Sequence, residues 1–135
     1  MMRIFVLHAI VVGLCVQTAF AQVSGSSPTC GDIAGETQKD LSNVKTFCEK
    51  AVPKGLGVVG ARANDMLLWI MVSRDTANYF CADKLTSKQA ILMWMKAWKA
   101  ITIETVTIRV EWRDVRIAEG QTTLFSGDKV TFSCP

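Results

Sequence analysis

Apolar and polar positions follow two different periods along the chain, which divides it into a helical half and a strand-rich tail. From about residue 32 to residue 101, apolar side chains recur every three or four residues, the spacing of one face of an α-helix. The first predicted helix has Asp32 as its N-cap and ends at Pro53 and Gly55. The positions that share its inner face are Ile33, Thr37, Leu41, Val44 and Cys48.

Residues 58–81 predict a second helix. Within it, the run Met-Leu-Leu-Trp-Ile-Met-Val at 66–72 is apolar on every side. By period alone, such a run fits a buried helix or a central strand equally well. We interpret it as helix because the segment is long.

The third predicted helix has the clearest start. Thr86 and Gln89 form a capping box, because each side chain satisfies a free backbone amide at the helix start. Its apolar stripe consists of Ile91, Trp94, Met95, Trp98 and Ile101, and its solvated face carries Lys88, Lys96 and Lys99. This distribution predicts an amphipathic helix.

Beyond residue 103 the period changes to two, which indicates a strand with one dry and one wet face. Turns are predicted at Glu119–Gly120 and at Gly127–Asp128. The dry face of this strand carries Val106, Ile108, Val110 and Trp112, and the wet face carries Thr107, Arg109, Glu111 and Arg113. In a last strand, Val130, Phe132 and Cys134 share one side. The predicted fold class is α+β, with about three helices followed by a small antiparallel β-meander.

The N-terminus, residues 1–21, predicts a cleaved secretory signal peptide. Arg3 supplies the positive start, an apolar run of 4–14 follows, and Ala19-Phe20-Ala21 is the small-x-small cleavage pattern. The apolar run is too short to span about 30 Å of hydrocarbon. Cleavage after Ala21 would leave a Ser-, Gly- and Pro-rich flexible lead-in at 22–29 and a single domain at 30–135 in a secreted or periplasmic protein.

Four cysteines follow the predicted cleavage site, and an exported chain pairs them as two disulfides. Cys30 and Cys48 are 18 residues apart, which corresponds to roughly 27 Å of continuous helix and excludes a bond between them. An antiparallel pair of helices favours Cys30–Cys81 with Cys48–Cys134. The alternative, Cys48–Cys81 with Cys30–Cys134, requires a break in the second helix. No Cys-x-x-Cys motif is present, so we expect neither a metal nor a redox site.

The residues that carry catalysis in most hydrolases are scarce. The single histidine, His8, is lost with the signal peptide, which excludes a Ser-His-Asp triad. Residues 55–60 match the dinucleotide string G-x-G-x-x-G but follow a helix instead of a strand, so we interpret them as a connection and expect no cofactor. Glu104, Glu111, Asp114 and Glu119 are the candidate acid–base carboxylates, yet the flanking arginines indicate a salt-bridge ladder.

The four tryptophans and the overall charge bear on possible partners. Trp94, Trp98 and Trp112 lie on predicted dry faces and are assigned with Trp69 to the core, although a Trp- and Lys-bearing helix could also contact an anionic membrane. The net charge of +3 is small and the basic residues are scattered, so no nucleic-acid partner is expected.

Phe80-Cys81, followed by Leu85-Thr86 and Gln89 at the start of an amphipathic helix, resembles the small periplasmic immunity proteins that neutralise amidase effectors of the bacterial type VI secretion apparatus. The resemblance extends over residues 80–94. The Gly-Tyr pair of that family is absent, and strands are predicted in place of its helical C-terminus. The resemblance implies an exported, disulfide-bonded protein that binds another protein.

Together these features predict a small exported, non-enzymatic protein-binding domain, such as an inhibitor, an immunity protein or an envelope accessory protein. Two alternatives stay open: a small hydrolase that uses two carboxylates, and a secreted membrane-active or lipid-binding protein.

Overall fold

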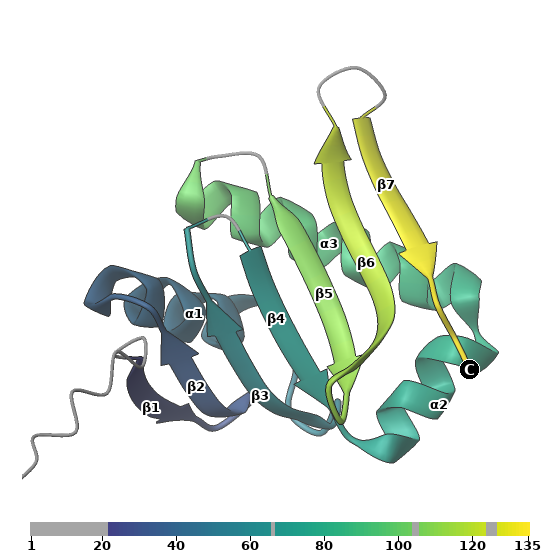
Figure 1. The fold of residues 1–135 in the computed structure, drawn as a ribbon, viewed down its shortest axis with the longest axis horizontal. Coiled ribbons are helices and arrows are strands. Elements are labelled where there is room, and N and C mark those ends of the chain that lie inside the picture. Colours follow the sequence, from purple (N-terminus) through teal and green to yellow (C-terminus); the bar gives the residue numbers. More distant parts are fainter. Residues whose placement is uncertain (1–21, 66, 104–105, 124–126) are drawn as a thin grey trace, which may run out of the picture.

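A seven-stranded mixed sheet with three helices forms the described part of the protein (Figure 1). The computed structural model describes residues 22–65, 67–103, 106–123 and 127–135. In chain order the elements are β1 (Val23–Ser27), β2 (Gly31–Gly35), α1 (Gln38–Ala51), β3 (Val58–Ala63), β4 (Leu67–Val72), α2 (Arg74–Ala82), α3 (Lys84–Thr102), β5 (Thr107–Trp112), β6 (Val115–Thr123) and β7 (Gly127–Phe132).

The strands lie in the sheet in the same order as in the chain. β2–β3 and β4–β5 are parallel pairs, connected by α1 and by α2 with α3, and the other four neighbouring pairs are antiparallel. The helices lie on one side, with α1 and α3 behind the strands in Figure 1. The α+β class is therefore correct. The predicted arrangement, helices followed by an antiparallel meander, is wrong because strands and helices alternate along the chain.

The largest error concerns residues 58–81, where we predicted one helix. Val58–Ala63 and Leu67–Val72 form the antiparallel strand pair β3–β4, and only α2 is helical in the described part of this segment. In β4 the buried residues are Leu68, Ile70 and Val72, a two-residue alternation. The intervening side chains are apolar as well, and this masked the strand period.

The first helix begins at Gln38 instead of Asp32, because residues 31–35 form β2. Its N-cap is Thr37, whose Oγ1 accepts a hydrogen bond from the Asp40 amide at 3.1 Å, while the Asp40 carboxylate accepts from the Thr37 amide at 3.2 Å. α3 also begins earlier than predicted. Its cap is Asp83, which accepts from the Thr86 amide at 3.1 Å, so the predicted Thr86 capping box is wrong.

At both ends of the chain the strands extend further than predicted. The expected lead-in at 22–29 contains β1, which pairs with β2. β5 confirms the predicted strand, but Glu119–Gly120 lies inside β6, and Gly127–Asp128 begins β7, where it pairs with β6. The β5–β6 turn is instead formed by Arg113 and Asp114, which both have positive φ.

The core lies between α1, α3 and the sheet. The buried residues of α3 are Ser87 and four members of the predicted apolar stripe, Ile91, Trp94, Met95 and Trp98, while the fifth member, Ile101, is half-buried. Phe47 of α1 meets Trp94 and Trp98 edge-on, with ring centroids 6.4 and 5.9 Å apart, and Phe80 of α2 stacks on Trp94 at 5.8 Å. These aromatic contacts join the three helices into one layer.

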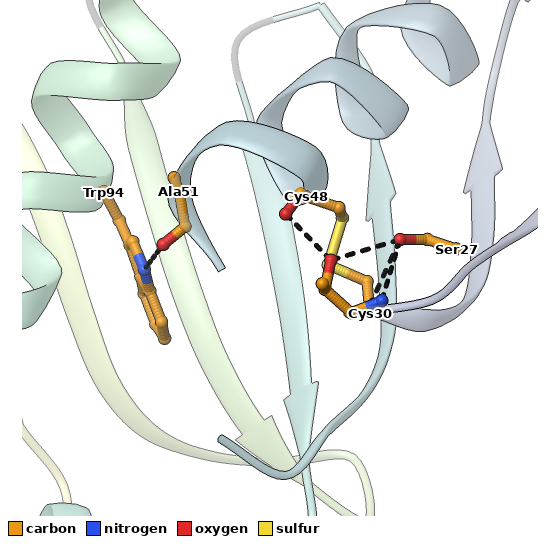
Figure 2. Close-up of a disulfide and its surroundings, with 6 residues drawn as sticks. Ser27, Cys30, Cys48, Ala51 and Trp94 are labelled. Carbon is orange, nitrogen blue, oxygen red and sulfur yellow. Dashed lines mark hydrogen bonds between the residues drawn. A yellow bond between two sulfur atoms is a disulfide. The ribbon is translucent and has the colours of Figure 1, made fainter. Parts of the chain in front are cut away.

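The disulfides are Cys30–Cys48 and Cys81–Cys134, each with Cα atoms 5.8 Å apart. Both predicted connectivities are wrong, including the exclusion of Cys30–Cys48. That exclusion assumed a continuous helix from residue 32, whereas the chain reverses direction between β2 and α1 and returns Cys48 to Cys30 (Figure 2). The Thr29 hydroxyl donates to the Cys48 carbonyl at 2.8 Å and holds the two segments together.

Two disulfides indicate an oxidising compartment, extracellular or periplasmic. The predicted signal peptide, residues 1–21, lies outside the described residues. Among the described helices, none has the length and apolar character needed to cross a membrane.

Candidate functional site

One face of the sheet carries the helices, and the described elements leave the other uncovered; we call the latter the open face (Figure 1 views it directly). In β4 the open face holds Leu67, Trp69 and Met71, which are half-buried, while the alternate residues are buried against the helices. The strand registers place the following side chains on the same face: Arg62 of β3, Thr107, Arg109 and Glu111 of β5, Glu119 and Gln121 of β6, and Lys129 and Thr131 of β7.

A single row of paired residues crosses this face from one edge of the sheet to the other. Its order is Ser24, Ala34, Arg62, Trp69, Arg109, Glu119 and Thr131, one residue from each strand. Trp69 therefore stands in the central strand with an arginine on either side. Cross-strand neighbours lie about 5 Å apart, so these side chains form one continuous surface.

Glu119 pairs with two arginines on the open face. Its Oε2 accepts from Arg109 Nε at 2.9 Å and from Arg116 Nη1 at 2.7 Å. Burial opposes ionisation of this carboxyl, but the hydrogen bonds and charges of the two arginines outweigh it and hold the pKa of Glu119 below its usual value. The predicted salt-bridge ladder was centred on Glu111 with Arg109 and Arg113, whereas the ion pairs that the structure shows join Arg109 and Arg116 to Glu119.

The other candidate carboxylates do not join Glu119 in a catalytic pair. Glu111 lies opposite Arg116 in the register, Asp114 is exposed in the β5–β6 turn, and Glu104 lies outside the described residues. The structure therefore brings Glu119 to two cations instead of to a second carboxylate.

Arg62 has a different environment. Its guanidinium carbon lies 4.7 Å from the centre of the Trp69 ring, a cation–π contact between cross-strand neighbours. Its Nε is shielded from solvent and has no hydrogen-bond partner among the described residues. Arg62 is thus a half-buried cation whose inner N–H donor is unsatisfied.

A pocket of about 250 Å³ lies beside this pair, at the end of the face where β2 and β3 finish and β4 begins. Its lining residues are Gln22, Glu36, Arg62, Ala63, Asn64 and Trp69. Backbone hydrogen bonds fix its walls: the Glu36 amide donates to the Ala63 carbonyl and the Asn64 amide to the Leu67 carbonyl, both at 3.1 Å. The pocket therefore combines one cation, one carboxylate, two amides and an indole.

A second pocket, of about 320 Å³ and mostly apolar, lies between α1 and α3 on the helical side. Trp94 and the exposed Met93 form part of its wall. The Trp94 indole N–H donates to the Ala51 carbonyl at 3.2 Å (Figure 2), which fixes Trp94 as a link between the two helices.

The structure also locates the glycine string at 55–60, the lysines of α3 and three of the tryptophans. Gly55 and Gly57 lie in the α1–β3 connection with positive φ, as interpreted, but residues 58–60 of the glycine string belong to β3 and are not part of the connection. The lysines of α3 are exposed, as predicted, and Trp94 and Trp98 are buried. Trp69 is not a core residue, because it faces away from the helices.

No protein-family model matches the chain, and neither a curated protein nor a solved structure matches it. Functional inference therefore depends on the open face and its pocket.

Proposed function

We propose that the protein is a small exported domain that binds another protein through the open face of its sheet and performs no chemistry. The observation that supports this most strongly is Trp69, half-buried in the central strand between Arg62 and Arg109, on a face that no described element covers. Tryptophan, methionine and arginine are enriched at the centres of protein interfaces, and this face has all three.

Two features support export as part of this proposal: the predicted signal peptide at 1–21 and the two disulfides. A secreted or periplasmic inhibitor, immunity protein or envelope accessory protein fits these features. In each of these roles the domain acts by occupying a surface of its partner, which requires a preformed face and no catalytic group.

Site-specific photo-crosslinking tests which face is used. A photoreactive residue at Gln121 probes the open face, and one at Lys96, exposed on α3, probes the helical side, where the resemblance to immunity proteins at residues 80–94 also lies. In secreted or periplasmic extract of the producing organism, we expect an adduct from position 121 and none from position 96.

The adduct must also depend on the open face itself. We expect Trp69→Ser to abolish it, and Met93→Ser to leave it unchanged, because Met93 is an exposed apolar residue of the helical side. Adducts from position 96 alone would place the partner on the helices instead. An adduct from position 121 that survives Trp69→Ser would argue against the proposal.

A further inference from the structure

The described arginines near the open face differ in how their donors are satisfied. Arg109 and Arg116 share Glu119, and Arg113 lies 5.3 Å above the Trp112 ring in an exposed turn. Arg62 is also stacked on a tryptophan, but its Nε is shielded from water and has no acceptor in the described part of the chain.

An N–H donor that is shielded from water and has no acceptor costs free energy, and such a group in a native structure calls for an explanation. The Arg62 guanidinium carbon lies 4.7 Å from the centre of the Trp69 ring, and none of the donors in the guanidinium plane has an acceptor among the described residues. A carboxylate is the natural acceptor for these donors, because it accepts two parallel N–H···O bonds in that plane.

The pocket beside Arg62 supplies the remaining parts of a carboxylate site. The side-chain amides of Gln22 and Asn64 are neutral donors, and Trp69 forms an apolar wall. The volume, about 250 Å³, suits one side chain. We infer that this pocket binds a carboxylate, and that the carboxylate comes from an Asp or Glu side chain on the protein partner. This inference rests on the proposed function.

Glu36 lies in the same pocket and determines the charge balance there. Cleavage after Ala21 would leave an α-amino group on Gln22, which is positively charged as long as this glutamine has not cyclised. The pocket lining would then carry two positive charges, this amine and Arg62, against the one carboxylate of Glu36. Removing the carboxylate raises the positive potential of the pocket. Glu36→Gln therefore tightens carboxylate binding.

The test uses the processed protein, beginning at Gln22, and two probes of nearly equal shape. One is N-acetylglutamate α-methylamide, whose single carboxylate is that of the side chain, and the other is the uncharged N-acetylglutamine α-methylamide. NMR follows the Nε–H signal of Arg62 and the indole N–H signal of Trp69, assigned with the variants Arg62→Gln and Trp69→Phe. We expect saturable shifts of both signals with the glutamate probe and none with the glutamine probe.

Two variants then test whether the carboxylate probe binds at the pocket itself or is attracted to any arginine stacked on a tryptophan. We expect Arg62→Gln to weaken the response of Trp69 on the order of tenfold, the loss expected for one charged hydrogen-bonded contact. Arg113→Gln is the matched control, since Arg113 is also stacked on a tryptophan but lies outside the pocket. Equal shifts with both probes, an equal effect of Arg113→Gln, or no saturable shift would each overturn the inference.

The two proposals fail in different ways. If position 121 gives its adduct and Arg62→Gln leaves the adduct and the probe response unchanged, the protein interface stands and the carboxylate site is wrong. If the glutamate probe binds but position 121 gives no adduct, the pocket stands and the protein partner as the source of the carboxylate is wrong.

Discussion

Gly35 lies at the end of β2, directly under the first turn of α1, and its replacement by alanine tests how closely helix and sheet are packed. A Cβ at this position would lie 2.3 Å from the Leu41 backbone nitrogen and 2.8 Å from the Asp40 carbonyl carbon. Ordinary van der Waals contact begins at 3.4 Å, so α1 would have to move by roughly 1 Å. Both neighbours are backbone atoms, so a side-chain rotation cannot relieve the overlap.

Overpacking of this kind costs about 1–3 kcal/mol. Alanine recovers about 0.4–1 kcal/mol by restricting the unfolded chain. We therefore expect Gly35→Ala to lower the free energy of unfolding by about 1.3 kcal/mol, which moves the urea midpoint by on the order of 1 M. Tryptophan fluorescence of the oxidised protein measures the transition.

Gly25→Ala is the matched control. Gly25 lies on the neighbouring strand β1, and a Cβ there would meet its nearest atoms at 3.5 Å or more. We expect the free energy of unfolding of this variant to stay within about 0.5 kcal/mol of wild type or to rise slightly. Equal midpoints for Gly35→Ala and wild type would show that α1 does not rest on β2 as described.

Two further predictions concern the disulfides and pH. The disulfides close loops of 18 and 53 residues, and the chain entropy of such loops predicts how much stability each bond contributes. We expect the free energy of unfolding to fall by about 3 kcal/mol in Cys30→Ser/Cys48→Ser and by about 4 kcal/mol in Cys81→Ser/Cys134→Ser. Urea midpoints should therefore rank the second variant as less stable, and the reverse ranking would contradict this reasoning. The lowered pKa of Glu119 stabilises the fold above the ordinary glutamate pKa of about 4.3, and this contribution is lost as pH falls through the folded value. Glu119→Gln should thus cost under about 1 kcal/mol near pH 7, a difference that narrows toward pH 3 in parallel urea titrations; a constant difference would refute the assignment.

The elements predicted correctly each have one dry face and one wet face. β5 alternates buried Ile108 and Val110 with polar residues, and α3 has an apolar stripe opposite its lysines. In both, the period of the sequence is the period of burial. Such a signal depends on local contrast alone, so a single sequence is enough to detect it.

β3 and β4 lack that contrast. The side of β4 opposite the helices carries Leu67, Trp69 and Met71, so both faces of the strand are apolar and the two-residue period disappears. The interpretation of 58–81 as a helix hid the candidate site as well, because Arg62 and Trp69 become cross-strand neighbours only when β3 and β4 pair. No alternation in the sequence distinguishes the buried Leu68, Ile70 and Val72, because the residues between them are apolar too.

The disulfide error had a different cause. A helix from Asp32 would have held Cys30 and Cys48 far apart, and the residues at 31–37 contain no strong strand signal. Their strand conformation depends on pairing with β1 and β3, which are distant or polar segments. Tertiary contacts of this kind leave no local pattern in the sequence.

Each disulfide joins cysteines that are consecutive in the described chain, Cys30 with Cys48 and then Cys81 with Cys134. A chain that crosses a membrane N-terminus first delivers its cysteines to the oxidising side in this order. In a chain exported in this direction, Cys30 and Cys48 could close before Cys81 and Cys134 arrive, and the order of arrival would favour the native connectivity. Mispaired bonds, which must otherwise be broken by thiol exchange, would then be avoided. We therefore expect oxidative folding of an exported chain to depend on an oxidant and not on a disulfide isomerase.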